Sequence, residues 1–206
     1  MLNRFKYYHC AFILGSLLFI AGPAKAFDWT ASNLQLLYGN NFELGTSDRM
    51  TVTVEHGHGW KYGTNFFFAD MVNRRDIGFE IYAELYTYLS FGKITGMDWS
   101  LGPVRDFALL GGLNISNRPE ERNFKAYLLG ISLDLSNPYI EHLQLDVAAY
   151  KNDRVSRKYG IQLTPVWSFP FGVGSLKFRF RGYMDIRSGN TNPHGNFHLL
   201  AQPLFL

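Results

Sequence analysis

The stretch FEIYAELYTY, residues 79–88, decides the fold. Its odd-numbered residues are apolar apart from Thr87, whereas its even-numbered residues are glutamates and tyrosines. Successive side chains of a β-strand point to opposite faces of a sheet, so this alternation predicts a strand with one apolar and one polar face. Residues 49–55, 142–149 and 176–185 alternate in the same way. The pattern predicts an all-β chain.

The rest of the chain, on both sides of these four segments, contains further strand and turn signals, so that ten antiparallel strands are predicted in all. Turn-forming residues recur at intervals of about 15 to 20 residues, which is typical of one closed sheet. Gly57 and Gly59 in HGHGW predict a turn, and so do Gly92 and Gly96. The predicted strands are residues 33–39, 49–56, 64–71, 78–90, 103–115, 123–135, 141–150, 157–167, 175–187 and 197–206.

The N-terminal residues read as a secretory signal peptide. Arg4 and Lys6 precede an apolar run at 11–21, and the small-x-small triplet AKA follows it. The run is shorter than the roughly 20 residues that a transmembrane helix needs, and a buried N-terminal helix is the less favoured alternative. The predicted division is a signal peptide at 1–26 and an outer-membrane β-barrel domain at 27–206.

Removal of the signal changes the charge balance, because it carries three of the 20 basic residues and none of the 17 acidic ones. The mature chain then has 20 − 3 = 17 basic residues against 17 acidic ones, so a pI near 8.9 gives no reason to expect a nucleic-acid polymer as partner. The single cysteine, Cys10, also lies in the signal, which excludes disulfides and thiolate metal sites from the mature chain. No cofactor is predicted.

Composition and strand length favour a membrane barrel. Aromatic residues make up 17% of the chain, charged residues 18%, and no second apolar run is long enough for a transmembrane helix. Several predicted strands exceed 10 residues, about the length that a tilted strand needs to cross a bilayer. A soluble barrel or sandwich with an apolar interior is the alternative. We predict an antiparallel transmembrane β-barrel in the outer membrane. Its aromatic girdles would contain Tyr38, Trp60, Tyr62, Trp99, Tyr139, Tyr159 and Trp167.

The polar faces of the strands would line the barrel's lumen. Acidic residues on early and middle strands would oppose a basic ladder on a late strand, and such a constriction selects polar solutes. Aromatic rings among these charges suit a flat solute such as a nucleobase. Alternatively, the charges pair across strands and plug the interior, and Phe66 and Phe68 face lipid. The predicted lumen residues are Glu55, Phe66, Phe68, Asp70, Glu80, Tyr82, Glu84, Tyr86, Asp146, Lys177, Arg179 and Arg181.

Metal binding and catalysis receive little support. His56 and His58 form an H-x-H pair, but no third ligand has a defined spacing, and a solvated loop is the favoured interpretation. No G-x-S-x-G motif occurs, although His142 or His198 could act with a serine in a barrel enzyme that modifies lipid. No catalytic residue and no metal site is predicted.

Three segments carry a resemblance to a known family: WKYGTNFFFAD (60–70), GFEIYAEL (78–85) and DWSLGPVRDFALLGGLNI (98–115). Here the chain resembles the nucleoside-specific channel-forming porin (Tsx-like) family, and within it the outer-membrane phage-receptor porins. NLQLLYG (33–39) and the block at 127–150 fit the same pattern. The resemblance implies a twelve-stranded monomeric barrel that carries nucleosides or similar solutes across the outer membrane.

The chain departs from this family in strand number and in its last residues. Ten strands are predicted rather than twelve, and the final segment contains Pro203 and ends in Leu206 instead of an aromatic residue. We therefore expect a C-terminally shortened form, in which strands 33–39 and 197–206 fail to pair along their full length. The expected function is a channel for passive diffusion of small polar solutes. A plugged structural barrel acting as a phage or adhesin receptor is the alternative, and a lipid-modifying enzyme is less favoured.

Overall fold

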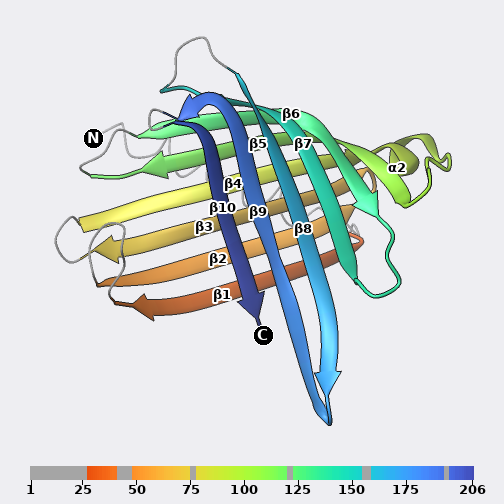
Figure 1. Ribbon diagram of the computed structural model, residues 1–206, viewed down its shortest axis with the longest axis horizontal. Coiled ribbons are helices and arrows are strands. Elements are labelled where there is room, and N and C mark those ends of the chain that lie inside the picture. The colour runs from red at the N-terminus through yellow and green to blue at the C-terminus, as the bar shows by residue number, and fades with distance from the viewer. Residues whose placement is uncertain (1–26, 41–47, 75–77, 120–122, 155–158, 193–194) are drawn as a thin grey trace, which may run out of the picture.

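The computed structural model describes residues 27–40, 48–74, 78–119, 123–154, 159–192 and 195–206, and the whole predicted signal peptide, 1–26, lies outside them. Ten antiparallel strands form one sheet, in which each strand pairs with its neighbours in the sequence (Figure 1). The strands are β1 (Trp29–Gly39), β2 (Arg49–Trp60), β3 (Gly63–Arg74), β4 (Gly78–Ser90), β5 (Val104–Asn117), β6 (Phe124–Leu135), β7 (His142–Asn152), β8 (Gly160–Val173), β9 (Leu176–Asn192) and β10 (Gly195–Phe205). The prediction of an all-β, antiparallel, ten-stranded sheet is confirmed.

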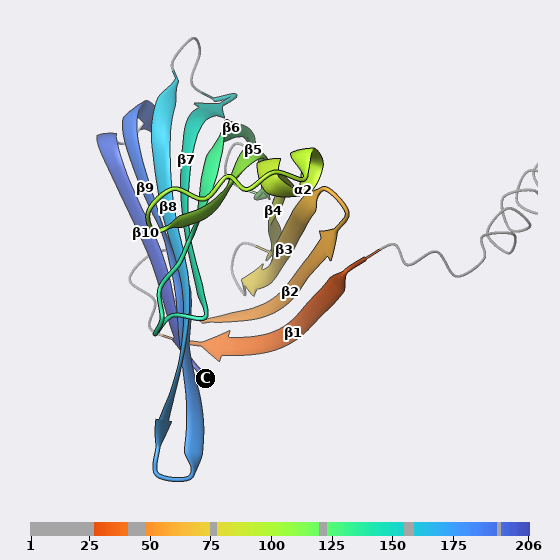
Figure 2. The same cartoon turned by 90° about the vertical axis from the view of Figure 1, so that its right-hand side faces the viewer.

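The sheet curls into a half-barrel (Figure 2). β1 and β10 are its two edges, and no ladder joins them within the described residues. β8 and β9 extend past their neighbours. The backbone of Leu206, just after β10, still bonds to β9, but β8 pairs with β7 only as far as Ser168 and β9 pairs on its other side only as far as Arg179. The hairpin between these two residues therefore projects as a two-stranded ribbon (Figures 1 and 2).

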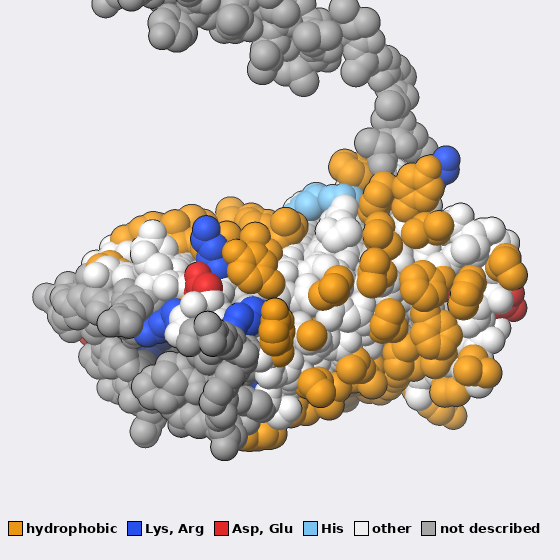
Figure 3. All heavy atoms as spheres, turned by 90° about the horizontal axis from the view of Figure 1, so that it is seen from above, with side chains coloured by type: hydrophobic (Ala, Val, Ile, Leu, Met, Phe, Trp, Pro, Cys, Tyr) orange, Lys and Arg blue, Asp and Glu red, His pale blue; other side chains and the backbone are white. Residues whose placement is uncertain are grey.

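The two faces of the sheet have opposite polarity. On the convex face, Leu34, Leu36 and Tyr38 are more than 70% exposed. Figure 3 shows one outer face of the molecule, over which hydrophobic side chains are spread while charged ones gather mainly toward one end. The concave face instead carries the buried side chains, and ten of them are polar or charged. Its buried polar residues are Thr53, Glu80, Glu84, Asn114, Ser116, Ser132, Asp146, Asn152, Gln162 and Asp185.

A small apolar cluster lies on the same concave face, across β4 to β7. It joins Tyr86 and Leu110 to Leu128 and Tyr150, with Ala126 and Ala148 between them. Gly112 has a packing role here, because a Cβ atom at this position would lie 2.8 Å from the Tyr86 ring. The ring of Tyr86 therefore packs over Gly112 of β5.

The turn predicted at HGHGW is wrong, since β2 continues through Gly57 and Gly59 to Trp60. The glycines serve a close approach instead of a turn. The indole of Trp29 covers both, and a Cβ atom on Gly59 would lie 2.2 Å from Trp29 Nε1. The chain turns two residues later, at Lys61 and Tyr62.

The predicted turn at Gly92 and Gly96 contains a short helix, α2 (Phe91–Thr95). Ser90 caps it by accepting a hydrogen bond from the Lys93 amide, and Gly96 ends it with a φ of 70°. Ser90 was predicted as the last residue of a strand, and it is both the last residue of β4 and the N-cap of α2. No helix in the described part of the chain is long and apolar enough to cross a membrane.

Candidate functional site: the concave cavity

The concave face holds a cavity of about 230 Å³. Side chains from both arms of the curl line it, from β1 to β4 on one side and from β7 to β9 on the other, with Leu110 on β5 and Leu128 on β6 between them. The walls combine aromatic rings with carboxylates. The rings belong to Trp29, Phe66, Phe68, Tyr86, Tyr88 and Tyr183, and the carboxylates to Glu84, Asp146 and Asp185.

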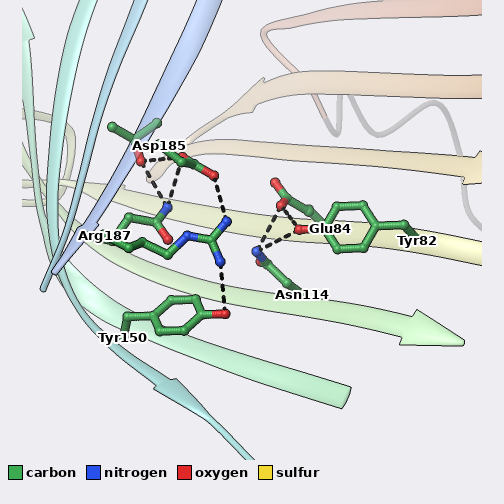
Figure 4. A network of polar contacts seen from close by, with 8 residues as sticks. Tyr82, Glu84, Asn114, Tyr150, Asp185 and Arg187 are labelled. Atoms are coloured by element: carbon green, nitrogen blue, oxygen red, sulfur yellow. Dashed lines mark hydrogen bonds and ion pairs between the residues drawn. The ribbon is translucent and has the colours of Figure 1, made fainter. Parts of the chain in front are cut away.

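Glu84 on β4 forms the first polar cluster of this wall (Figure 4). It accepts a short hydrogen bond from the Tyr82 hydroxyl, and Asn114 Nδ2 on β5 donates to Glu84 Oε1 at 2.8 Å. Glu84 is 6% exposed and Asn114 is fully buried. Tyr82 and Glu84 come to lie side by side because they are two positions apart on one strand and so share a face.

Asp185 and Arg187 on β9 form the second cluster (Figure 4). Asp185 Oδ1 accepts from Gln162 Nε2 at 3.0 Å and from Thr164 Oγ1 at 2.7 Å, both on β8. Arg187 Nη2 lies 3.6 Å from Asp185 Oδ2, and Arg187 Nη1 donates to the Tyr150 hydroxyl at 3.1 Å. A buried guanidinium is thus held between a carboxylate and a tyrosine.

Asp146 on β7 is the third buried carboxylate. Its two oxygens accept from Gln144 Nε2 at 2.8 Å and from the Tyr88 hydroxyl at 3.0 Å. Tyr88 is on β4, so this hydrogen bond crosses the concave face between segments 58 residues apart. The cavity wall is therefore fixed from both arms of the curl.

Glu55 and Arg181 connect the two ends of the sheet. Arg181 Nη2 on β9 lies 2.9 Å from Glu55 Oε2 on β2, although 126 residues separate them. The same Glu55 oxygen also accepts from Asn33 and Gln35 on β1. The first and last strands of the described sheet are thereby brought toward one another without backbone pairing.

The predicted lumen residues fall into three groups. Five line the cavity, namely Phe66, Phe68, Glu84, Tyr86 and Asp146. Five others lie on the concave face beside it: Glu55 pairs with Arg181, Asp70 accepts from Thr53, Tyr82 bonds to Glu84, and Glu80 lies 4.0 Å from the Arg118 guanidinium. Lys177 and Arg179 are outside the cavity.

The predicted basic ladder consists of Lys177, Arg179 and Arg181, and these three residues do not all face the predicted acidic residues. Lys177 lies exposed on the projecting hairpin, and Arg179 pairs with Glu141 just before β7. Hydrogen bonding to Arg179 holds the pKa of the Glu141 carboxyl below its usual range. Only Arg181 reaches an acidic residue of the predicted set, because Arg179 lies where the paired part of β9 ends, next to Glu141, and Lys177 lies beyond that point.

Sequence reasoning omitted Gln162, Thr164, Asp185 and Arg187 from the site. Arg187 could have been found by continuing the alternation of 176–185 for two more residues. Gln162 and Thr164 gave a weaker signal, because the residues that follow them on β8 are apolar on both faces. Alternation predicts the face on which a side chain lies, but it does not predict which carboxylate and which guanidinium on different strands form a pair.

The histidines lie at several separate places. His56 and His58 are on β2 rather than in a loop, with His56 Nε2 3.1 Å from His58 Nδ1, and His58 Nε2 2.9 Å from Asn65 Nδ2. The described residues contain no group of three or more side chains suited to hold a metal ion. His142 lies across from Ser168 in the ladder, but Ser168 Oγ accepts a hydrogen bond from Arg179 at 2.8 Å.

Comparison with known proteins gives one result. No curated protein and no solved structure matches the chain. The model of the family described as Domain of unknown function (DUF5020) matches residues 31–206, which include nearly the whole sheet and every residue of the cavity wall except Trp29. The chain therefore belongs to the DUF5020 family.

Proposed function

We propose that this protein is an outer-membrane β-barrel through which small polar solutes diffuse passively. One observation carries the proposal: apolar side chains cover the convex face, whereas the concave face buries ten polar side chains, four of which line a cavity. A water-soluble sheet buries its apolar face, and a membrane barrel exposes it to lipid. The protein is expected to act as a monomer.

Strand length and the positions of aromatic residues support insertion into a bilayer. Every strand has between 11 and 17 residues, and about 9 to 11 are enough to span a membrane at the usual tilt. Trp60, Tyr62, Trp99 and Tyr139 lie at one end of the strands, and Tyr38 and Tyr159 at the other. Two such bands fit the two interfaces of a membrane.

In the membrane the half-barrel would close. Each unpaired backbone group in hydrocarbon costs several kcal/mol, so the free edges of β1 and β10 would not persist there. The pairing of Glu55 with Arg181 supports this step, because it already holds the two edges on the same side of the molecule.

Nucleosides are the proposed solutes. The support is the resemblance to nucleoside-specific porins together with a cavity in which aromatic rings alternate with hydrogen-bonding groups. Base rings stack on aromatic side chains, and sugar hydroxyls and base edges exchange hydrogen bonds with polar ones. Phe66 and Tyr86 are the stacking candidates, with Glu84 and Asp146 as hydrogen-bond partners.

A plugged receptor barrel is the second candidate, and the polar clusters favour it. Glu84, Asp146 and Asp185 each bond to side chains of a neighbouring or opposite strand, so part of the interior is filled by cross-strand contacts. A barrel of this kind would keep the same lipid-facing surface but pass no solute.

Liposome swelling distinguishes the candidates. Protein refolded into liposomes should admit nucleosides faster than sugars of equal size. Equal rates would refute the nucleoside preference. No swelling with either solute would refute the channel and favour the plugged barrel.

A further inference from the structure

The charge of the cavity wall is unbalanced. Three carboxylates line it, those of Glu84, Asp146 and Asp185, whereas no lysine or arginine is among its described lining residues. The nearest compensating cation is Arg187, which pairs with Asp185 and leaves the other two carboxylates to neutral partners. A cavity whose wall carries this excess of carboxylates attracts cations and repels anions.

The hydrogen-bonding capacity of the wall is unbalanced in the same direction. Gln162 lines the cavity, is 1% exposed and uses its amide nitrogen on Asp185 and Thr164, while its Oε1 has no partner. Asp185 Oδ2 has no hydrogen bond either and faces Arg187 only at 3.6 Å. Buried acceptors without donors are costly, and the partial negative charge of these two oxygens adds to that of the carboxylates beside the cavity.

The aromatic walls suit the same kind of occupant. A positive charge over the face of an aromatic ring is attracted by the negative potential of the ring. The protein already uses this contact beside the cavity, where the Arg187 guanidinium lies 5.0 Å from the centre of the Tyr150 ring. Phe66, Tyr86 and Tyr88 provide further rings within the wall.

We propose that the cavity takes organic cations, in particular protonated amines, and excludes anions. The inference deepens the proposed function by naming the class of polar solute, and it rests on that function where it takes the cavity as the solute's path. Nucleosides whose bases carry an amino group would also be accepted, because that group donates hydrogen bonds to the wall. Nucleotides would be rejected because their phosphate is negatively charged.

Three ring compounds of similar size and different charge test the proposal: benzylammonium, benzamide and benzoate. Protein refolded into planar bilayers is first placed in a KCl gradient, where the sign of the reversal potential should report K⁺ selectivity. Each compound is then added while the K⁺ current is recorded. Benzylammonium should block at a concentration at least about tenfold lower than benzamide, since hydrogen bonds to charged groups are the stronger ones. Benzoate should not block.

Variants locate the effect. Asp146→Asn keeps an acceptor for Tyr88 or Gln144 but removes one cavity charge, and should raise the blocking concentration of benzylammonium roughly tenfold. Asp98→Asn is the control, because Asp98 lies exposed between α2 and β5 and its loss changes the net charge equally. Heat-modifiable migration on gels confirms that each variant is folded.

The outcomes separate the two proposals. Conductance with equal block by all three compounds, or an equal effect of both variants, overturns the cation inference and leaves the channel standing. If wild-type protein does not conduct, the channel is refuted, and calorimetric titration of refolded protein with benzylammonium then decides the inference. Binding that Asp146→Asn weakens supports it, and no binding overturns it.

Discussion

At the residue scale, the most consequential side chain is the buried guanidinium of Arg187. It lies between Asp185 and Tyr150, and both members of the ion pair are at most 13% exposed (Figure 4). Arg187→Met would leave the Asp185 carboxylate buried without its cation, which should lower the free energy of unfolding by about 3 to 5 kcal/mol. Urea unfolding in detergent, followed by tryptophan fluorescence, measures the loss.

Arg105→Met is the matched control for Arg187. Arg105 pairs with Asp134 at 2.6 Å, but the two side chains are 50% and 44% exposed. An exposed pair contributes about 1 kcal/mol or less, so this variant should unfold at nearly the wild-type urea concentration. Equal losses for the two variants would contradict the burial of the Arg187 network.

A second prediction at this scale concerns the glycine beneath Trp29. Gly59→Ala would place a methyl group on the indole and should destabilise the protein by about 1 to 3 kcal/mol while shifting the Trp29 emission. Gly111→Ala serves as control, because a Cβ atom there meets nothing within 4 Å. If both substitutions were equally tolerated, Trp29 would not lie over β2.

At the element scale, Glu55 and Arg181 connect strands that share no ladder. A double-mutant cycle with Glu55→Gln and Arg181→Gln should give a coupling energy of about 1 kcal/mol or less, because both side chains are partly exposed. The coupling should fall as salt is raised. Purely additive effects at low salt would mean that the two edges of the sheet are independent.

The strands themselves could be predicted from the sequence, and the reason is the clean period of two. Residues 79–88 alternate with Thr87 as the one exception, and the strand predicted there, 78–90, has the bounds of β4. HGHGW failed because its glycines accommodate Trp29, a contact that is tertiary and leaves no local pattern. α2 was missed because a helix of five residues has no room for a helical period.

The site could be predicted only in part. Glu84, Tyr86 and Asp146 were found because alternation assigns each residue to a face. Lys177 and Arg179 were placed on the correct strand, but alternation does not show that this strand continues beyond its neighbours. The height of a residue relative to the neighbouring strands depends on the register of all ten strands, and the sequence of a single strand does not show that register.

At the scale of the whole molecule, the sheet exposes apolar side chains on its convex face and buries polar ones on its concave face, the reverse of what a soluble sheet does. The convex face presents Leu36 at 73% and Leu129 at 64% exposure, while the concave face buries ten polar side chains. Exposed apolar area on this scale needs a partner, and for a curled sheet with polar groups inside we propose that this partner is the lipid of a bilayer. The channel proposal and the cation inference both depend on this orientation.

Single cysteines on the two faces test that orientation most directly. In a Cys10→Ser background, Leu36→Cys and Leu129→Cys report on the convex face, and Thr64→Cys and Gln144→Cys on the cavity wall. In protein refolded into liposomes, the first pair of cysteines should not react with a water-soluble maleimide. When the same cysteines are labelled with a fluorophore in unfolded protein and the protein is then refolded into liposomes, brominated lipid chains should quench the fluorescence. The second pair should react with the maleimide and escape quenching. Rapid labelling of the convex positions, with no quenching by brominated lipid, would contradict the account.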